Sequence, residues 1–234
     1  KGGTGNDFYL VDDAGDVVIE VAGAGSGIDT VQVGINLFAL PDNFENLLFA
    51  GTGNFTGTGN TENNNIVGGA GNDVVDGGAG NDEIDSGAGD DSLESGEGED
   101  LIDGGAGGGD IAIYDGAEGD FTVLRIILGK KSGFTLNGAS AEEIVALTDK
   151  QGRTDRMVHV ERVNFGGDER SLTGSDALKA SRTVTADKYL SDDGGKNGLT
   201  GAAKNEVLDG LEGNDTLKGG AGTTRCSAAA ATTS

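Results

Sequence analysis

Aspartates recur every nine residues in the segment 68–103, and this spacing carries the clearest chemical signal in the chain. The segment repeats the pattern G-G-x-G-x-D-x-U-x, in which U is a large aliphatic residue. Its first two copies, GGAGNDVVD and GGAGNDEID, match at seven of nine positions. The sixth position holds Asp73, Asp82, Asp91 and Asp100, and the eighth holds Val75, Ile84, Leu93 and Ile102. A fixed period in sequence predicts a fixed repeat in space, so we expect these carboxylates to form regular rows.

The period extends beyond this segment in both directions, with weaker chemistry. Counted backward in steps of nine, the sixth position becomes Asn64, Phe55 and Asn46, and the eighth becomes Ile66, Gly57 and Leu48. Counted forward, GGAGGGD at 104–110 has one additional glycine, which places Asp110 one residue late. We therefore expect the strongest cation ligands between residues 68 and 110.

A parallel β-roll is the all-β fold that this period favours. Nine is a poor helical period, and each glycine would cost about 1 kcal/mol in a helix. The G-G-x-G-x-D part suits a tight turn, because glycine adopts positive φ more readily than other residues. The x-U-x part suits a short strand whose aliphatic side chain points inward. Two repeats then complete one turn of a β-solenoid, and residues two repeats apart stack directly on one another.

This stacking predicts a calcium site. Asp73 is expected above Asp91 on one edge and Asp82 above Asp100 on the other, at a strand spacing of roughly 5 Å. Like charges at that distance repel, and a divalent cation between the turns would replace repulsion with cohesion. Carboxylate and turn-carbonyl oxygens suit Ca²⁺ better than Mg²⁺, which demands a tighter octahedron. Zn²⁺ is disfavoured because the chain has one His and one Cys.

The predicted metal ligands are stacked carboxylates and turn carbonyls. The pairs that support an ion site are Asp73 with Asp91, Asp82 with Asp100, and Asp91 with Asp110, the last weakened by the additional glycine. Asn64 with Asp82 is a fourth pair with less charge. Turn carbonyls are expected from positions 68, 70, 77 and 86, which hold Gly68, Ala70, Gly77 and Ser86. Three or more ions are expected in total.

The composition excludes several classes of partner. Asp and Glu outnumber Lys and Arg by 40 to 16, giving a formal net charge of −24. This balance argues against nucleic acids and anionic membranes, which attract clustered cations. A Gly-rich acidic chain is also typical of disorder, but a disordered linker is not expected to keep an aliphatic eighth position four times. The single Cys226 permits no internal disulfide, and no run of 18 apolar residues predicts a membrane span.

Residues 68–103 resemble the calcium-binding β-roll of RTX (repeats-in-toxin, hemolysin-type) proteins, and GGTGNDFYL at 2–10 is a further match to their nonapeptide. The resemblance implies several bound Ca²⁺ ions, a secreted bacterial protein and export by type I secretion machinery. Met157 is the only methionine, so we expect the chain to be a piece of a longer protein. On the resemblance, residues 68–112 are the RTX roll.

The segment 1–67 is predicted to be a degenerate N-terminal β-solenoid. AGSGIDTVQ at 24–32 keeps Asp29 and the aliphatic Val31 of the repeat. Asp7 and Asp29 are candidate ligands for one more ion, with Asp13 and Asp16 as further candidates or as ordinary solvated turn residues. Asn46 and Asn64 are expected to stack as an amide ladder.

The segment 113–175 resembles the β-rich capping module that follows the roll in many RTX proteins. Its runs of apolar residues predict strands and hairpins, and ASAEEIVALTD predicts a short helix capped by Ser140. A second, degenerate array is predicted at 176–222, where Asp215 alone keeps the proper ligand type, and a low-complexity tail at 223–234.

No catalytic motif is found, so we expect this part of the protein not to be an enzyme. HExxH and G-x-S-x-G are absent, and His159 is interpreted as a surface or packing residue. The leading hypothesis is a secreted module that folds on extracellular Ca²⁺ and supports the export and stability of an attached effector. The alternative is a Ca²⁺-stabilised adhesin, S-layer or polysaccharide-binding module on the cell surface. Its candidate polymer contacts are Lys130, Lys131, Arg153, Arg156 and Arg162.

Overall fold

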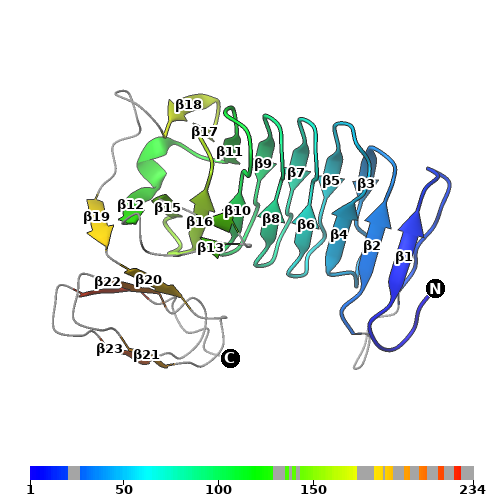
Figure 1. Ribbon diagram of the computed structural model, residues 1–234, viewed down its shortest axis with the longest axis horizontal. Coiled ribbons are helices and arrows are strands. Elements are labelled where there is room, and N and C mark those ends of the chain that lie inside the picture. Colours follow the sequence, from blue (N-terminus) through cyan, green and yellow to red (C-terminus); the bar gives the residue numbers. More distant parts are fainter. Residues whose placement is uncertain are drawn as a thin grey trace. The chain divides into compact units, whose positions relative to one another are not determined.

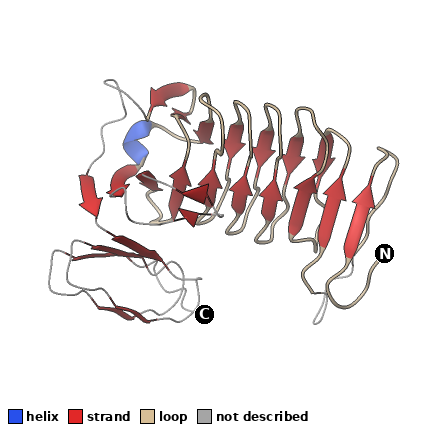
Figure 2. Cartoon of the chain, viewed as in Figure 1, coloured by secondary structure: helices blue, strands red, loops and turns tan. Residues whose placement is uncertain are grey.

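The computed structural model describes residues 1–20, 27–128, 135–136, 139–140, 143–172, 182–186, 188–191, 198–200, 206–209, 216–218 and 224–227. The chain forms two compact units. One consists of Lys1–Asp120 with Asp155–Leu178, and the other of Phe121–Thr154 with Lys179–Ser234. Among the described residues the only helix is the 3₁₀ turn η1 (Glu118–Asp120), shown in blue in Figure 2, and the remaining elements are strands.

The first unit is a parallel β-solenoid in which successive strands from β2 to β11 alternate between two sheets (Figure 1). One sheet has the order β1-β2-β4-β6-β8-β10-β16. Its strands are β1 (Phe8–Val11), β2 (Thr30–Val33), β4 (Asn46–Phe49), β6 (Asn65–Val67), β8 (Glu83–Asp85), β10 (Leu101–Asp103) and β16 (Thr154–Val158). The opposite sheet begins with β3 (Leu37–Ala39), β5 (Thr56–Thr58), β7 (Val74–Asp76), β9 (Ser92–Glu94) and β11 (Ile111–Tyr114). It ends with β17 (Arg162–Phe165) and the antiparallel β18 (Asp168–Ser171). The predicted fold class is confirmed.

The core of the solenoid consists of the aliphatic side chains at the eighth position of each repeat. Ile66, Ile84 and Ile102 pair in register in one sheet, and Val75 pairs with Leu93 in the other. All five are buried. Because each strand has three residues and side chains alternate between the two faces, only the central residue points inward. The repeat therefore needs one aliphatic residue in every nine.

The glycines of each repeat differ in their role. The second and fourth positions have positive φ, as at Gly69 (100°) and Gly71 (117°), whereas Gly68 and Gly77 at the first position do not. Residues with a Cβ rarely adopt such φ values. The first position therefore accepts serine, at Ser86 and Ser95, without backbone strain.

The earlier turns depart from the count of nine, and the predicted stack of Asn46 on Asn64 is wrong. Leu47 pairs with Ile66, a step of nineteen, so Asn46 lies opposite Asn65. Asn46 donates instead to Thr30 Oγ1 at 3.1 Å, and Asn64 donates to the Phe44 carbonyl at 3.0 Å. The residue facing the core in β4 is Leu47 rather than Leu48. One additional residue between the strands shifts the register without breaking the sheet.

The segment 113–175 is divided between the two units. Residues 155–172 lie with the roll, where β16 pairs with β10 and β17 pairs with β11. Residues 121–154 belong to the second unit, in which β12 (Thr122–Leu128) pairs antiparallel with β15 (Glu143–Thr148). The predicted helix at ASAEEIVALTD is wrong, because EIVALT forms β15 and Ser140 lies in the short strand β14 (Ala139–Ser140). The β-branched residues and the apolar partners in β12 favour the strand.

The second unit contains further paired strands. β12 pairs parallel with β19 (Arg182–Ala186), and β13 (Thr135–Leu136) pairs antiparallel with β14. The remaining pairs are parallel strands separated by two repeats. β20 (Lys188–Ser191), β22 (Glu206–Asp209) and β24 (Thr224–Ser227) form one sheet, and β21 (Gly198–Thr200) pairs with β23 (Thr216–Lys218). Leu199 is aligned with Leu217, as a two-repeat turn requires. β24 lies within the segment interpreted as a low-complexity tail.

Candidate metal centre

Each strand of the central roll is preceded by a carboxylate that binds the backbone of the turn before it. Asp82 Oδ1 accepts the Asn64 N–H at 2.8 Å, and Asp100 Oδ1 accepts the Asp82 N–H at 2.8 Å. We call Asn64, Asp82, Asp100 and Asp155 the first ladder, since Asp155 Oδ1 continues it by accepting the Asp100 N–H at 3.1 Å. The predicted stacking of Asp82 with Asp100 is present in the fold.

A second ladder runs along the other edge through Phe55, Asp73, Asp91, Asp110 and Glu161. The N–H groups of Phe55, Asp73 and Asp91 donate to Oδ1 of Asp73, Asp91 and Asp110 respectively, each at 2.8 Å. The Asp110 N–H donates to Glu161 Oε2 at 3.0 Å. Each of these carboxylates is therefore fixed by a charge-assisted hydrogen bond to the neighbouring turn.

The second oxygen of these carboxylates is buried and accepts no hydrogen bond. Within the described parts of the chain this is true of Oδ2 in Asp73, Asp82, Asp91, Asp100 and Asp110. The five aspartates are at most 2% exposed. A buried acceptor left unsatisfied costs about 1–3 kcal/mol, and more when it is charged. Because every turn repeats this unsatisfied buried oxygen, we infer that these oxygens bind a ligand.

The first-position glycines leave space beside these oxygens. A Cβ placed on Gly68 would lie 2.6 Å from Asp73 Oδ2 and 2.7 Å from the Ser86 carbonyl oxygen. At Gly77 the corresponding neighbours are Asp82 Oδ2 and the Ser95 carbonyl oxygen. A carboxylate oxygen and a carbonyl oxygen of the next turn thus converge on the same space. Hard oxygen donors of these two types fit Ca²⁺.

The electrostatics of the ion-free roll are unfavourable for charged carboxylates. Burial, with the nearby Asp100 carboxylate as a further cause, raises the pKa of Asp82 to about 7. Burial likewise raises the pKa of Asp73 and of Asp110 to about 6, with Asp91 adding to both. Residues 68–110 contain no Lys or Arg that could compensate. A divalent cation at the Oδ2 atoms would supply the missing positive charge.

Comparison with protein families agrees with this geometry. The model of the RTX calcium-binding nonapeptide repeat (4 copies) matches residues 58–93, 84–111 and 200–223. The chain carries the repeats of the RTX family. RTX repeats bind Ca²⁺, so calcium is the cofactor of this roll. No curated protein matches the chain. The described residues contain no helix of the length and hydrophobicity needed to cross a membrane.

The RTX roll includes ligand candidates that the nonapeptide pattern does not reveal. Asp155 and Glu161 take the ladder positions after Asp100 and Asp110, although they follow them by 55 and 51 residues. The His159 carbonyl oxygen lies beside Gly104 and Asp110. The Ser86 carbonyl oxygen has the corresponding position beside Gly68 and Asp73. Glu161 lies in the segment 113–175, and the resemblance of that segment to the RTX capping module is the only sequence feature that pointed to it.

His159 itself contacts the roll through its imidazole. Nδ1 lies 2.7 Å from Oδ1 of the buried Asp103, so the side chain packs on the last repeat as expected of a packing residue. Its φ of 52° is unusual for a residue with a side chain. With this φ, the His159 carbonyl oxygen lies beside Gly104 and Asp110.

A further ladder of exposed side chains at the fifth position of the RTX repeat was not predicted. The Asn72 N–H donates to Asn54 Oδ1 at 3.0 Å, and the Asp90 N–H donates to Asn72 Oδ1 at 3.1 Å. On the other edge the Asn81 N–H donates to Asn63 Oδ1 at 2.8 Å. These bonds run in the opposite direction to those of the aspartate ladders. Each turn of the roll is therefore bound to both of its neighbours.

The remaining predicted site residues fall into three groups. Gly77 contributes a carbonyl beside Asn64 Oδ1 and Gly59, whereas Ala70 forms a β-bridge with Ala88 and its carbonyl stays a predicted ligand. Asp7 and Asp29 are brought together, since the Asp7 N–H donates to Asp29 Oδ1 at 2.7 Å. Asp215 lies outside the described residues.

Asp13 and Asp16 are exposed and are not part of a cluster with Asp29. Asp16 Oδ2 accepts the Asp13 N–H at 3.2 Å, and Asp13 Oδ1 accepts the Gly15 N–H at 2.8 Å. These bonds close a local turn. The interpretation of both residues as solvated turn carboxylates is confirmed.

Proposed function

We propose that the RTX roll is a folding switch that is unfolded at low Ca²⁺ and folds when Ca²⁺ is plentiful, as part of a secreted bacterial protein. The observation that carries the proposal is the row of buried Oδ2 atoms that accept no hydrogen bond. A chain with this many buried carboxylates gains little from folding until cations bind them. Ion binding then supplies folding free energy by mass action.

The proposed ion sites lie between successive carboxylates of each ladder. The first ladder supplies Asp82 with Asp100 and Asp100 with Asp155. The second supplies Asp73 with Asp91, Asp91 with Asp110, and Asp110 with Glu161. Each ion would join two turns through Oδ2 and the carbonyl oxygens beside the first-position glycines. The Asn64–Asp82 pair has one charge fewer and is a poorer site.

The switch suits export through a type I secretion channel. Inside a bacterium free Ca²⁺ is low, so carboxylate repulsion would keep the chain extended for passage. Extracellular modules commonly bind Ca²⁺ with Kd values of about 10⁻⁴–10⁻³ M, which places folding outside the cell. The folded roll would then stabilise an attached effector. The proposal assigns no catalysis to this part of the chain.

The alternative, a polysaccharide-binding or adhesive surface, has less support from the described contacts. Arg162 is joined to Glu169 at 3.0 Å, and Arg153 is joined to Asp149 at 2.6 Å. Arg156 is buried. Lys130 and Lys131 lie outside the described residues. Cations already paired with carboxylates are poor contacts for an acidic polymer, since binding would have to break the existing pairs.

A calcium titration of the whole chain tests the proposal. Far-UV circular dichroism is recorded from EDTA to about 10 mM Ca²⁺, a range that covers the Kd of extracellular sites. We expect a cooperative gain of β signal, no gain with Mg²⁺, and protease resistance that appears over the same range. Asp91→Asn should raise the midpoint, whereas Asp13→Asn, at an exposed turn, should not. A chain already folded in EDTA at about pH 8 would contradict the proposal.

A further inference from the structure

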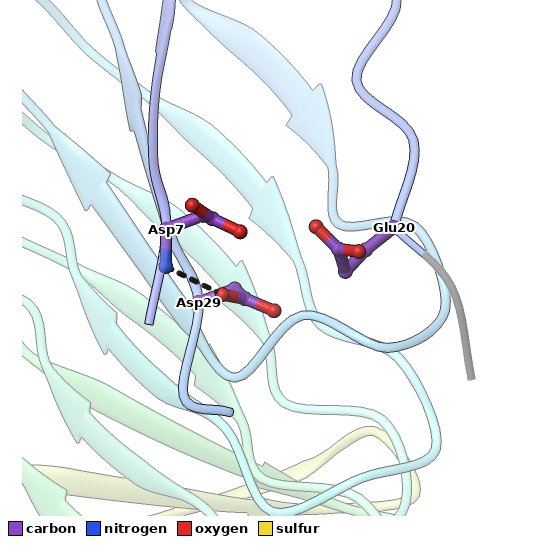
Figure 3. A group of neighbouring side chains, drawn as sticks. All are labelled: Asp7, Glu20 and Asp29. Carbon is purple, nitrogen blue, oxygen red and sulfur yellow. Dashed lines mark hydrogen bonds between the residues drawn. The ribbon is translucent and has the colours of Figure 1, made fainter. Parts of the chain in front are cut away.

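Three carboxylates from outside the uninterrupted repeat meet at the N-terminal end of the roll (Figure 3). Asp7 precedes β1, Asp29 precedes β2, and Glu20 lies in the long segment that connects these strands. One carboxylate oxygen of each lies within 4.8 Å of those of the other two. Asp7 and Asp29 follow the repeat pattern, but Glu20 does not belong to it.

The three side chains are held in place by the chain around them. The Gly3 N–H donates to Glu20 Oε1 at 2.9 Å, and the Tyr9 hydroxyl donates to Glu20 Oε2. The Asp7 N–H donates to Asp29 Oδ1 at 2.7 Å. A Cβ on Gly2 would collide with Asp7 Oδ2, Tyr9 Oη and Glu20 Oε2. The glycine therefore leaves open a space that is lined by oxygen atoms.

One carboxylate oxygen in this cluster is both buried and unsatisfied. Asp29 is 0% exposed, and its Oδ2 accepts no hydrogen bond from the described residues. The carboxylate group points toward those of Asp7 and Glu20 (Figure 3). Its other oxygen, Oδ1, accepts the Asp7 N–H at 2.7 Å. The Oδ2 atom therefore has no hydrogen-bond partner among the described residues, and a bound cation would satisfy it.

We propose that Asp7, Glu20 and Asp29 bind one Ca²⁺ ion at a site distinct from those of the nonapeptide repeats. Ligands of Ca²⁺ lie about 2.3–2.6 Å from the ion, so two ligands of one ion are at most about 5 Å apart. The separation of 4.8 Å meets this limit. Three carboxylates provide only oxygen donors and a formal charge of −3, which suits a hard divalent cation and not Zn²⁺.

An ion bound by Asp7, Glu20 and Asp29 would fix the first turn of the solenoid, and we call this site the clamp. β1 is the edge strand of its sheet, so its outer side has no described neighbouring strand. Asp7 and Asp29 are 22 residues apart, against 18 between stacked residues of the regular roll. The excess length lies in the connection that carries Glu20. An ion shared by all three residues would bind this connection and residues 2–3 to the roll.

Terbium luminescence and ion counting on the whole chain test the site. Tyr9 donates to Glu20, so its ring lies beside the proposed ion and should sensitise Tb³⁺ bound there. In Glu20→Gln we expect one fewer Ca²⁺ by equilibrium dialysis, weaker tyrosine-sensitised emission, and little change in the Ca²⁺ midpoint of the β signal. Asp29→Asn should also lose one Ca²⁺, because one carboxylate ligand is removed. The turn should be retained, since the amide oxygen of Asn can still accept the Asp7 N–H. Asp13→Asn should retain the full ion count.

The outcomes separate this site from the folding switch. Full ion counts and full emission in both Glu20→Gln and Asp29→Asn would overturn the clamp and leave the switch intact. A chain already folded in EDTA at about pH 8 would overturn the switch, while Tyr9-sensitised emission would still report on the clamp. Tyr9→Phe should abolish the emission component that Glu20→Gln weakens. Persistence of that component in Tyr9→Phe would assign it to another site and contradict the proposal.

Discussion

The Asp91 N–H donates to Asp110 Oδ1 at 2.8 Å across nineteen residues, and the Asp73 N–H donates to Asp91 Oδ1 at the same distance across eighteen. The additional glycine in residues 107–109 therefore does not displace the carboxylate. The hydrogen bond of the Asp91–Asp110 pair has the same length as that of the regular pair, and weaker Ca²⁺ binding at Asp91–Asp110 stays a prediction. The turn absorbs the extra residue, because Gly108 lies where even a Cβ would meet no atom within 4 Å.

Asp91→Ala should be more damaging to Ca²⁺ binding than Asp73→Ala. Asp91 lies between two carboxylates of the second ladder, Asp73 and Asp110, whereas Asp73 follows Phe55, which has no ligand atom in its side chain. We expect the Ca²⁺ midpoint to rise about tenfold in Asp91→Ala and about threefold in Asp73→Ala, differences of about 1.4 and 0.7 kcal/mol. Circular dichroism during a Ca²⁺ titration measures both. Equal shifts would contradict the assignment of two sites to Asp91.

Asp155→Asn should remove one ion while keeping the fold. The amide oxygen can still accept the Asp100 N–H, but the charge that closes the first ladder is lost. Burial raises the pKa of Asp155 to about 7, with the Asp100 carboxylate as the next cause, so an intervening cation would stabilise the charged pair. Equilibrium dialysis should show one fewer Ca²⁺ per chain. The matched control is Asp168→Asn, at an exposed carboxylate of β18, and an unchanged count in Asp155→Asn would exclude the site.

The ion-free roll should be more stable in mild acid than in alkali. The pKa values of Asp73, Asp82 and Asp110 are raised by burial to about 6, 7 and 6 from an ordinary 3.8. The folded state therefore holds more protons than the unfolded state, and the unfolding free energy falls as the pH rises from about 4 to about 7. In EDTA we expect β signal at about pH 5 that is lost by about pH 8.

The control for this pH dependence is the same scan in saturating Ca²⁺. Bound cations keep the carboxylates charged and satisfied, so the loss of β signal toward pH 8 should disappear. Replacing Asp73, Asp82 and Asp110 together by Asn should also flatten the scan in EDTA. A β signal in EDTA that grows with rising pH has the wrong sign for raised pKa values and would refute this account.

Gly71→Ala should destabilise the roll, whereas Gly108→Ala should not. Gly71 has a φ of 117°, and a Cβ there would lie 2.7 Å from the Gly53 carbonyl oxygen. Both the strained φ and the contact oppose the substitution, so we expect a loss of more than about 1 kcal/mol in unfolding free energy. Gly108→Ala should stay within about 0.5 kcal/mol of the unchanged chain. Urea unfolding at saturating Ca²⁺ compares the two, and equal effects would argue against the turn geometry.

Much of the roll could be predicted because its chemistry is local. The turn, the strand and the buried aliphatic residue all lie within nine residues, and Asp73, Asp82 and Asp91 recur without interruption. Where a turn has one additional residue, counting in steps of nine assigns the wrong residue to the core. The core residue of β4 is therefore Leu47 and not Leu48. Similarly, EIVALT has the apolar content of either a helix or a strand, and its pairing with β12 decides between them.

The sequence by itself determined the period, the solenoid, the stacked aspartates and the choice of Ca²⁺, because these follow from residue types repeated at short range. Only the tertiary structure decided where the rows of carboxylates end. Asp155 and Glu161 complete the ladders although they lie more than fifty residues further along the chain, and Glu20 reaches Asp7 and Asp29 from an irregular connection. Such positions depend on which distant strand docks on an open edge, and no short-range pattern encodes that contact.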